Sequence, residues 1–323
     1  MALLGEDGRK RRVIERAKEV DHEHRRRGTA SESALVQVLS LRLLRMALRR
    51  LLSRPKPAMP RPVAPPPPGH IAVTFVGHAS VMLTTNQARI LVDPFFGDFL
   101  SGIRRRESAC LAKADAEQTS LLLISHAHRD RLDLPSLRRL PRRARLVVPP
   151  RCRSLVESLG FAEVTELPPG QSLDHADVEV TAVPARHDGR RGVFDRAWRS
   201  TCGYIVKCGE ASVYYAGDTA YFSGFEEIGR RLHPDVALLP IAGYRPPQQR
   251  SDHMSPLDAV HAFQDLGAKL LVPIGYGSFP VGYEPDDEPL AWLFEECRAR
   301  KLGDRLVVLR PGETCQVHGG APA

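Results

Sequence analysis

From Ile71 onward, short apolar runs alternate with turn-forming residues, and this pattern predicts a succession of strands. Short runs rich in Val, Ile and Leu are typical of strands buried on both faces. The predicted strands are 71–76, 80–84, 89–92, 121–125, 146–148, 178–183, 203–207, 213–216, 236–239, 270–274 and 306–309. Apolar residues at helical spacing predict helices over 223–232, 256–266 and 287–300. Strand-rich halves with helices outside them indicate an α+β fold, a four-layer αββα sandwich with two sheets at its core.

The pattern is different before residue 71. Residues 1–30 are polar and charged, and residues 33–53 place apolar side chains at helical spacing with arginines along one flank. The apolar stripe consists of Leu35, Val36, Leu39, Leu43, Met46 and Ala47. A basic amphipathic helix of this kind can lie on an anionic membrane surface, whereas further leucines widen its apolar face and favour docking on the protein or a partner. A Pro-rich linker over 55–70 follows, so the chain divides into residues 1–54, 55–70 and a domain over 71–318.

Composition narrows the compartment and the partners. The 323-residue chain has a net charge of +8, and much of it comes from residues 9–54. Six cysteines without a CxxC pair favour a reducing compartment. Neither a long apolar run nor an apolar N-terminal segment is present, so we expect a cytoplasmic protein, with peripheral membrane contact through residues 33–53 as an open alternative. The basic tail lacks interleaved aromatic residues, and no nucleic-acid partner is expected.

The segment from Ser125 to Asp133, Ser-His-Ala-His-Arg-Asp-Arg-Leu-Asp, carries the first candidate chemistry. It follows the apolar run 121–124, which predicts a buried strand. In an extended segment, residues 126, 128 and 130 project to the same side. Two imidazoles and a carboxylate are a ligand set suited to Zn²⁺, Fe or Mn. Arg131 places a cation where a dinuclear centre would most naturally add another ligand.

Further residues of ligand type follow other predicted strands. His187 comes after strand 178–183, Asp218 comes after strand 213–216, and His253 precedes the helix over 256–266. Each one alone is more often a surface or capping residue. Their occurrence in this order, together with the 126–130 segment, makes a shared site the better interpretation.

This order of motifs resembles a known family. The matching stretches are Phe75-Val76-Gly77-His78-Ala79-Ser80, Val92-Asp93-Pro94, the segment 126–133, Ala185-Arg186-His187-Asp188-Gly189-Arg190, Ala216-Gly217-Asp218-Thr219, His253-Met254-Ser255-Pro256 and Gly275-Tyr276-Gly277-Ser278-Phe279-Pro280. The chain from about Val73 to Pro289 is similar to the metallo-β-lactamase fold superfamily. Within it, the chain most resembles the branch that holds N-acyl-phosphatidylethanolamine phospholipase D and L-ascorbate-6-phosphate lactonase.

The resemblance implies a role for each matching residue. His126, His128 and His187 would form a first metal site, which Asp218 would bridge to a second site containing Asp130. Asp93 would lie behind the ligands and accept a hydrogen bond from one of their imidazoles.

His253 and His78 lie outside these metal sites, and each of them has two possible interpretations. His253 would stand near the substrate as a proton donor or anion contact, or else only precede the helix that begins at Pro256. His78 would line the same cleft, or else be a core histidine bonded to the backbone.

Two positions depart from the family pattern, and both weaken the second metal site. Arg131 replaces the last histidine of HxHxDH, and Gly275 replaces a late histidine. A guanidinium cannot ligate a metal, so we hypothesise that Arg131 pairs with Asp130 or Asp218 and that Gly275 leaves room for it. Three histidines and one carboxylate still suffice for one ion, Zn²⁺ before Mn or Fe. Asp130 would then orient the attacking water, and Arg131 would stabilise an oxyanion.

The predicted function is a metal-dependent hydrolase that uses activated water on a phosphodiester, phospholipid or lactone. Its substrate would be a small-molecule or lipid-like anion. Its second metal position would be empty or depleted. The alternative is a catalytically degenerate binding or scaffold protein that holds an anionic ligand in the same cleft.

Overall fold

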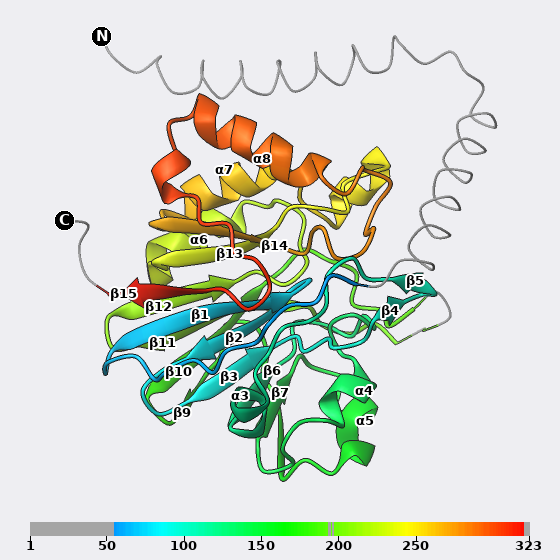
Figure 1. Ribbon diagram of the computed structural model, residues 1–323, viewed down its shortest axis with the longest axis vertical. Coiled ribbons are helices and arrows are strands. Elements are labelled where there is room, and N and C mark those ends of the chain that lie inside the picture. Colours follow the sequence, from blue (N-terminus) through cyan, green and yellow to red (C-terminus); the bar gives the residue numbers. More distant parts are fainter. Residues whose placement is uncertain (1–54, 193–194, 196, 320–323) are drawn as a thin grey trace. The chain divides into compact units, whose positions relative to one another are not determined.

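The structure is a computed structural model that describes residues 55–192, 195 and 197–319. Two β-sheets lie face to face at the centre of the domain, and helices cover their outer faces (Figure 1). The predicted α+β sandwich of four layers is therefore confirmed. The basic amphipathic helix predicted over residues 33–53 lies outside the described residues.

The first sheet has seven strands in the order β15-β1-β2-β3-β6-β7-β8. Its strands are β1 (His70–Gly77), β2 (Ser80–Thr84), β3 (Arg89–Val92), β6 (Leu121–Leu123), β7 (Arg145–Val148), β8 (Glu163–Glu166) and β15 (Thr314–His318). The strands from β15 to β3 are antiparallel, and those from β3 to β8 are parallel. The parallel half therefore brings the carboxyl ends of β3 and β6 to one edge of the sheet.

The second sheet has six strands in the order β14-β13-β12-β11-β10-β9. Its strands are β9 (Ser172–His175), β10 (Val178–Pro184), β11 (Cys202–Cys208), β12 (Ala211–Tyr215), β13 (Val236–Pro240) and β14 (Leu270–Ile274). A separate hairpin consists of β4 (Phe99–Leu100) and β5 (Ile103–Arg104).

Alternation along the strands divides the apolar residues among the layers. In β12, Val213 and Tyr215 lie in the core between the two sheets, whereas Tyr214 points outward to the helices. In β6, Leu121 and Leu123 face the central core and Leu122 faces the opposite side. Strands buried on both faces need apolar residues at successive positions, which explains why these strands read as continuous apolar runs.

The longer helices cover the second sheet. They are α6 (Gly224–Leu232), α7 (Pro256–Leu266) and α8 (Glu288–Ala299), and their apolar residues join one core cluster with the outer faces of β12, β13 and β14. Helix α7 begins at a capping box in which Ser255 and Asp258 exchange side-chain and backbone hydrogen bonds. Short helical segments lie beside the first sheet at α3 (Lys113–Glu117), α4 (Leu134–Leu137) and α5 (Arg153–Val156), and single 3₁₀ turns occur at Glu157–Leu159, Pro247–Ser251 and Gly303–Arg305.

One predicted strand is wrong, and five strands of the described residues are unpredicted, among them the two-residue strands β4 and β5 of the hairpin. Residues 306–309 form a single parallel bridge between Leu306 and Leu271, after which the chain leaves the sheet. The apolar residues there pack against the core without a ladder of hydrogen bonds. Strands β8, β9 and β15 were missed because exposed and half-buried positions dominate them, so they lack a continuous apolar run.

The Pro-rich segment predicted as a linker packs against the domain. The backbone of Lys56 bonds to Arg106 and Ser108, and the Val63 N–H donates to the Asp115 carboxylate at 3.1 Å. The Arg89 guanidinium also contacts this segment, since it donates to the Val63 carbonyl at 2.9 Å. These bonds hold the start of the described chain on the first sheet.

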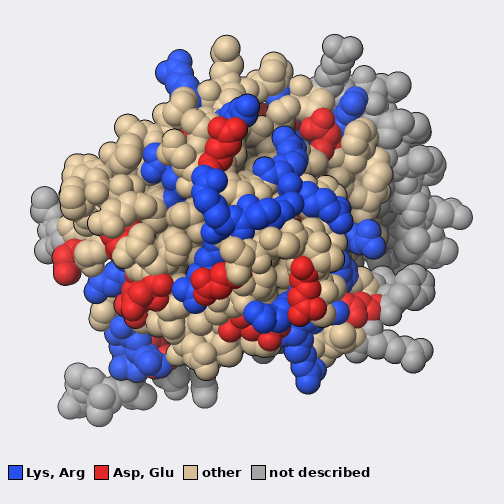
Figure 2. Space-filling model, turned by 90° about the horizontal axis from the view of Figure 1, so that it is seen from below, with Lys and Arg blue, Asp and Glu red and all other residues tan. Residues whose placement is uncertain are grey.

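Positive and negative residues are nearly equal in number after residue 54, but the surface still carries local concentrations of charge. On the face seen in Figure 2, Lys and Arg side chains form a band across the middle, and Asp and Glu lie mostly to one side of it. Such a band raises the local concentration of anions near the protein. Within residues 55–192, 195 and 197–319, no helix is both long and apolar enough to cross a bilayer.

Candidate metal centre

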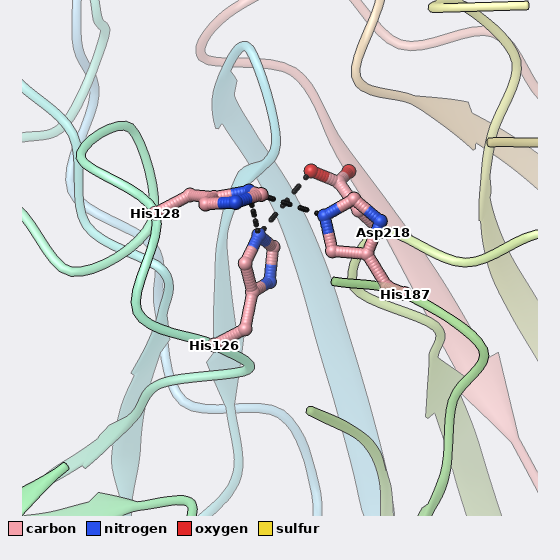
Figure 3. Close-up of side chains that lie close together, drawn as sticks. All are labelled: His126, His128, His187 and Asp218. Atoms are coloured by element: carbon pink, nitrogen blue, oxygen red, sulfur yellow. Dashed lines mark hydrogen bonds and ion pairs between the residues drawn. The ribbon is translucent and has the colours of Figure 1, made fainter. Parts of the chain in front are cut away.

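Three imidazoles and one carboxylate converge on a common point where the two sheets meet (Figure 3). Their ligand-type atoms, from His126, His128, His187 and Asp218, all lie within 4.8 Å of one another. His128 Nδ1 is 3.0 Å from His126 Nε2 and 3.1 Å from His187 Nε2, and Asp218 Oδ2 is 3.5 Å from His126 Nε2. The sequence predicted these four residues as a group, and the structure brings them together.

Strand ends of both sheets supply the four residues. His126 and His128 follow β6 of the first sheet, whereas His187 follows β10 and Asp218 follows β12 of the second. Two hydrogen bonds tie the His187 and Asp218 segments together: Arg186 N to Thr219 Oγ1 at 2.9 Å, and Ala220 N to Arg186 O at 2.8 Å.

A glycine allows the two sheets to approach each other beside the ligands. Gly217 has φ +65°, and a Cβ there would lie 2.8 Å from Ser125 Cβ. The turn before Asp218 can therefore pass Ser125 only without a side chain.

Hydrogen bonds fix which imidazole nitrogens are free. The Ser125 hydroxyl donates to Asp93 Oδ2 at 2.5 Å, so its oxygen accepts from Nδ1–H of His126 at 2.9 Å. Nδ1 of His187 donates to the Asp252 carbonyl at 2.8 Å, since a carbonyl can only accept. These bonds assign the lone pairs of both Nε2 atoms to the common point in Figure 3.

The donor set fits one divalent cation. Two Nε2 lone pairs face His128 Nδ1, and a neutral imidazole has at most one proton there to share between them. In a tetrahedral Zn²⁺ site with bonds of about 2.1 Å, neighbouring ligands are roughly 3.4 Å apart, close to the observed spacing. A cation at the common point would satisfy the lone pairs and the Asp218 carboxylate together.

Burial keeps the imidazoles neutral, as metal ligands must be. Burial and the neighbouring histidines lower the pKa of His126 well below its usual value, and burial also lowers the pKa of His128 and His187. Burial alone would raise the pKa of Asp218, but Arg131 and the histidines hold it well below its ordinary range. The carboxylate is therefore ionised and the imidazoles are not.

Asp130 does not join this group. The chain turns after His128, whose carbonyl accepts from the backbone N–H groups of Arg131 and Leu132 at 3.1 and 2.8 Å. Residues 127–132 are therefore not extended as predicted, and Asp130 is not among the residues whose ligand atoms converge. Oδ2 of Asp130 instead binds Arg131 at 2.6 Å and His78 Nε2 at 2.9 Å.

Arg131 lies between two carboxylates, as hypothesised. Its two terminal nitrogens contact Asp130 Oδ2 and Asp218 Oδ1, each at 2.6 Å, and the residue is 1% exposed. Arg131 is not among the residues that line the cleft described below. The structure therefore does not place its guanidinium where it would contact a substrate oxyanion, as had been expected. Gly275, with φ +71°, would direct a Cβ toward Pro240, and no contact links it to Arg131 among the described residues.

Asp93 is linked to the ligand His126 through the Ser125 hydroxyl. Its carboxylate accepts from Ser125 N at 2.7 Å, Ser125 Oγ at 2.5 Å and Tyr215 Oη at 2.7 Å. The direct bond expected between Asp93 and a ligand imidazole is thus replaced by a relay through Ser125. Burial raises the pKa of Asp93 to about 6, while Arg131, Ser125 and Tyr215 act in the opposite direction.

Removing the Tyr215 hydroxyl is expected to destabilise the protein, whereas removing the hydroxyl of the neighbouring Tyr214 is not. Tyr215→Phe removes a buried donor to a carboxylate, which costs about 1.5–3 kcal/mol. The buried Tyr214 hydroxyl has no hydrogen-bond partner among the described residues, so Tyr214→Phe is expected to be neutral or stabilising. Denaturant unfolding of the two variants measures the difference, and equal losses would contradict the assigned bond.

A cleft of about 430 Å³ opens above the metal ligands. It is lined by Leu100, Ser101, Ile103, His128, Arg129, Asp130, Arg191, Gly192, Asp218, His253, Phe279, Pro280 and Val281. His253 is among these residues, and its ring centroid is 4.9 Å from that of His187. His78 is fully buried behind the cleft and bonds to Asp130, not to the backbone as the core interpretation had it.

Sequence reasoning missed the residues that support the ligands. Ser125 and Tyr215 relay Asp93 to the site, and Arg191 donates to the carbonyls of Ala127 and Leu132 at 2.8 and 3.0 Å. A serine beside a histidine motif and a tyrosine in an apolar strand carry no signal of their own. Arg191 lies in a stretch of charged residues where nothing marks one arginine as partly buried.

Comparison with known proteins agrees with this geometry. The family described as "Beta-lactamase superfamily domain" matches residues 88–276, which is more than half of the chain. The chain belongs to the beta-lactamase superfamily. The match spans the strand ends that carry His126, His128, His187 and Asp218, so the four converging residues lie inside the superfamily domain.

Relatives within the superfamily carry hydrolase names. A "UPF0173 metal-dependent hydrolase" of Caldivirga maquilingensis is 30% identical over 74% of this chain and 95% of the relative. "N-acyl-phosphatidylethanolamine-hydrolyzing phospholipase D 1" of Caenorhabditis elegans is 28% identical over 65% of this chain, which spans 64% of that protein. The solved structure of Igni18, a metallo hydrolase from Ignicoccus hospitalis, covers 76% of this chain and 98% of its own, with TM-score 0.60 and 24% identity. At that identity the structural likeness shows the fold alone.

Proposed function

We propose that this protein is a metal-dependent hydrolase that cleaves an amphiphilic anionic ester, and that the phosphodiester of a phospholipid is its substrate class. The observation that carries the proposal is the buried group of three imidazoles and one carboxylate that opens onto a cleft. A divalent cation held there by these four residues, Zn²⁺ before Mn or Fe, would lower the pKa of water and polarise the substrate.

The protein's own residues would position the attacking water. Asp130 lines the cleft, and both of its described side-chain contacts, with Arg131 and His78, use Oδ2. Oδ1 is therefore the acceptor that would orient water beside the metal ligands. His253 lines the same cleft next to His187, and it would donate a proton to the leaving group.

The lining of the cleft supports a substrate that is both charged and apolar. Arg129 is exposed at its rim and Arg191 is half-buried within it, so both can bind an anionic group. Leu100 and Ile103 of the β4–β5 hairpin, together with Phe279, supply apolar surface in the same cleft. A phospholipid combines the two properties, and a relative is named as a phospholipase D.

Chelation is expected to abolish hydrolysis. The full-length protein, stripped of metal and reloaded with Zn²⁺, should hydrolyse N-acyl-phosphatidylethanolamine in mixed micelles faster than bis(p-nitrophenyl) phosphate or a simple lactone. A chelator should lower the rate at least about 100-fold, because the water would lose its activating cation. Re-addition of Zn²⁺ after removal of the chelator should restore the rate.

The same assay separates the alternatives. A faster reaction with the lactone would move the proposal to that substrate class. Metal-loaded protein that is silent on all three substrates would favour the degenerate binding protein.

The state of the thiols supports a proposal about the compartment. All six cysteines are free, and five of them are buried. Unpaired thiols support a reducing compartment such as the cytoplasm. Membrane contact through residues 33–53 remains part of the proposal, because a micellar or bilayer substrate would require the enzyme to reach a surface.

A further inference from the structure

A buried guanidinium occupies the space between two carboxylates beside the candidate metal ligands. Arg131 contacts Asp130 Oδ2 and Asp218 Oδ1 at 2.6 Å each, and its Nε is 3.8 Å from Asp93 Oδ2. Asp130 and Asp218 are 88 residues apart in sequence but bind the two ends of one planar group. One charge-assisted hydrogen bond to each carboxylate holds the planar guanidinium in place.

We propose that Arg131 is a permanent cation in the place of a second metal ion and restricts the centre to one metal per chain. The inference rests on the proposed metal centre and adds its stoichiometry. Asp218 then has two separate tasks: Oδ2 faces the imidazoles as a ligand, and Oδ1 accepts from Arg131. The carboxylate does not bridge two metal ions.

Charge balance supports a single ion. The three carboxylates that surround the guanidinium belong to Asp93, Asp130 and Asp218, and the side chains are at most 17% exposed. One divalent cation and one guanidinium neutralise these three carboxylates. A second divalent cation would leave excess positive charge in a site shielded from water, where charge repulsion is strong.

Two of the oxygens that would face a second metal, Asp130 Oδ2 and Asp218 Oδ1, already accept from Arg131. Ions in two-metal sites lie about 3.5–4 Å apart, and they are held by carboxylates that face both ions. Here Oδ2 of Asp130 accepts from Arg131 and from His78, whose ring is fully buried against Phe95 and Phe279. A metal at this position would have to displace a guanidinium that cannot lose its proton.

Metal counting tests the stoichiometry without relying on activity. Full-length wild type, stripped and reloaded with excess Zn²⁺ and then desalted, is expected to retain about one ion per chain by elemental analysis. Arg131→His removes the fixed charge and adds a ligand, so it should retain about two. Arg131→Lys keeps a cation at the position and should stay near one.

Arg105 offers a matched control. It is also 1% exposed, but it lies against Phe95 and Phe279, and its guanidinium donates to the Phe95 carbonyl. Arg105→His should therefore retain about one ion per chain, because no carboxylate pair is released. Circular dichroism of every variant verifies folding, and Arg131→Gln replaces Arg131→His if the latter does not fold.

Each count decides between the two proposals. Two ions in wild type would overturn the role of Arg131 and leave the metal centre standing. No ion in wild type would overturn the proposed function together with this inference. One ion in folded Arg131→His, equal to wild type, would show that the guanidinium does not exclude the second metal. Loading with Mn²⁺ adds a second readout, since only the variant should give the exchange-coupled paramagnetic spectrum of two neighbouring ions.

Discussion

Replacing His187 with alanine is expected to remove bound metal and lower hydrolysis at least about 1,000-fold, a loss of roughly 4 kcal/mol of transition-state stabilisation. His187 Nε2 is 3.1 Å from His128 Nδ1, and its other nitrogen is held by the Asp252 carbonyl. The variant leaves two imidazoles and one carboxylate, which bind a divalent cation less tightly. Elemental analysis and the micelle assay measure the two losses.

His175 provides the control for this change. It lies at the end of β9 beside the start of β10, whereas His187 follows the far end of β10. Its imidazole binds Ser120 Oγ at 3.1 Å and is outside the candidate centre. His175→Ala should keep its metal and its activity. If His187→Ala retained metal as wild type does, the ligand assignment would be refuted.

The sequence predicted the layers and the group of ligands because both leave repeated signals. Apolar runs at successive positions mark strands buried on both faces, and β12 shows the pattern in Val213, Tyr214 and Tyr215. Asp218 was identifiable because it follows such a strand, and His187 because it follows β10, in which buried valines alternate with polar residues. The four-residue strand β8 is polar at three positions and gave no comparable signal, and the apolar run at 306–309 marks packing without sheet pairing.

The geometry around the ligands could not be predicted, because it depends on tertiary contacts that leave no local pattern in the sequence. The turn after His128 separates Asp130 from the imidazoles, and it is held in part by Arg191, which is distant in sequence. The relay from Asp93 through Ser125 joins strand ends of the first sheet. A pairing of Arg131 with Asp130 or Asp218 was anticipated from the replaced histidines, and the structure pairs the guanidinium with both carboxylates.

The Asp93 carboxylate connects this relay to the stability of the domain. It accepts three hydrogen bonds from Ser125 and Tyr215 and is fully buried. Asp93→Ala is expected to destabilise the protein by about 3–5 kcal/mol, because it leaves buried donors unpaired and removes a carboxylate beside Arg131. For a domain of this size, the melting temperature should fall by roughly 6–20 °C. Thermal unfolding of metal-free protein measures this effect apart from metal binding.

Asp93→Asn is expected to separate stability from metal binding. The amide oxygen can still accept from Ser125 N, but an NH₂ group in place of Oδ2 would donate to the Ser125 hydroxyl. Ser125 would then donate to Nδ1 of His126 and move the imidazole proton to Nε2, the atom that faces the other ligands. We expect a smaller loss of stability than in Asp93→Ala, with Zn²⁺ affinity still lower by about 10- to 100-fold. Competition with a chromogenic chelator measures the affinity, and wild-type affinity in a folded Asp93→Asn protein would show that the relay does not set the His126 tautomer.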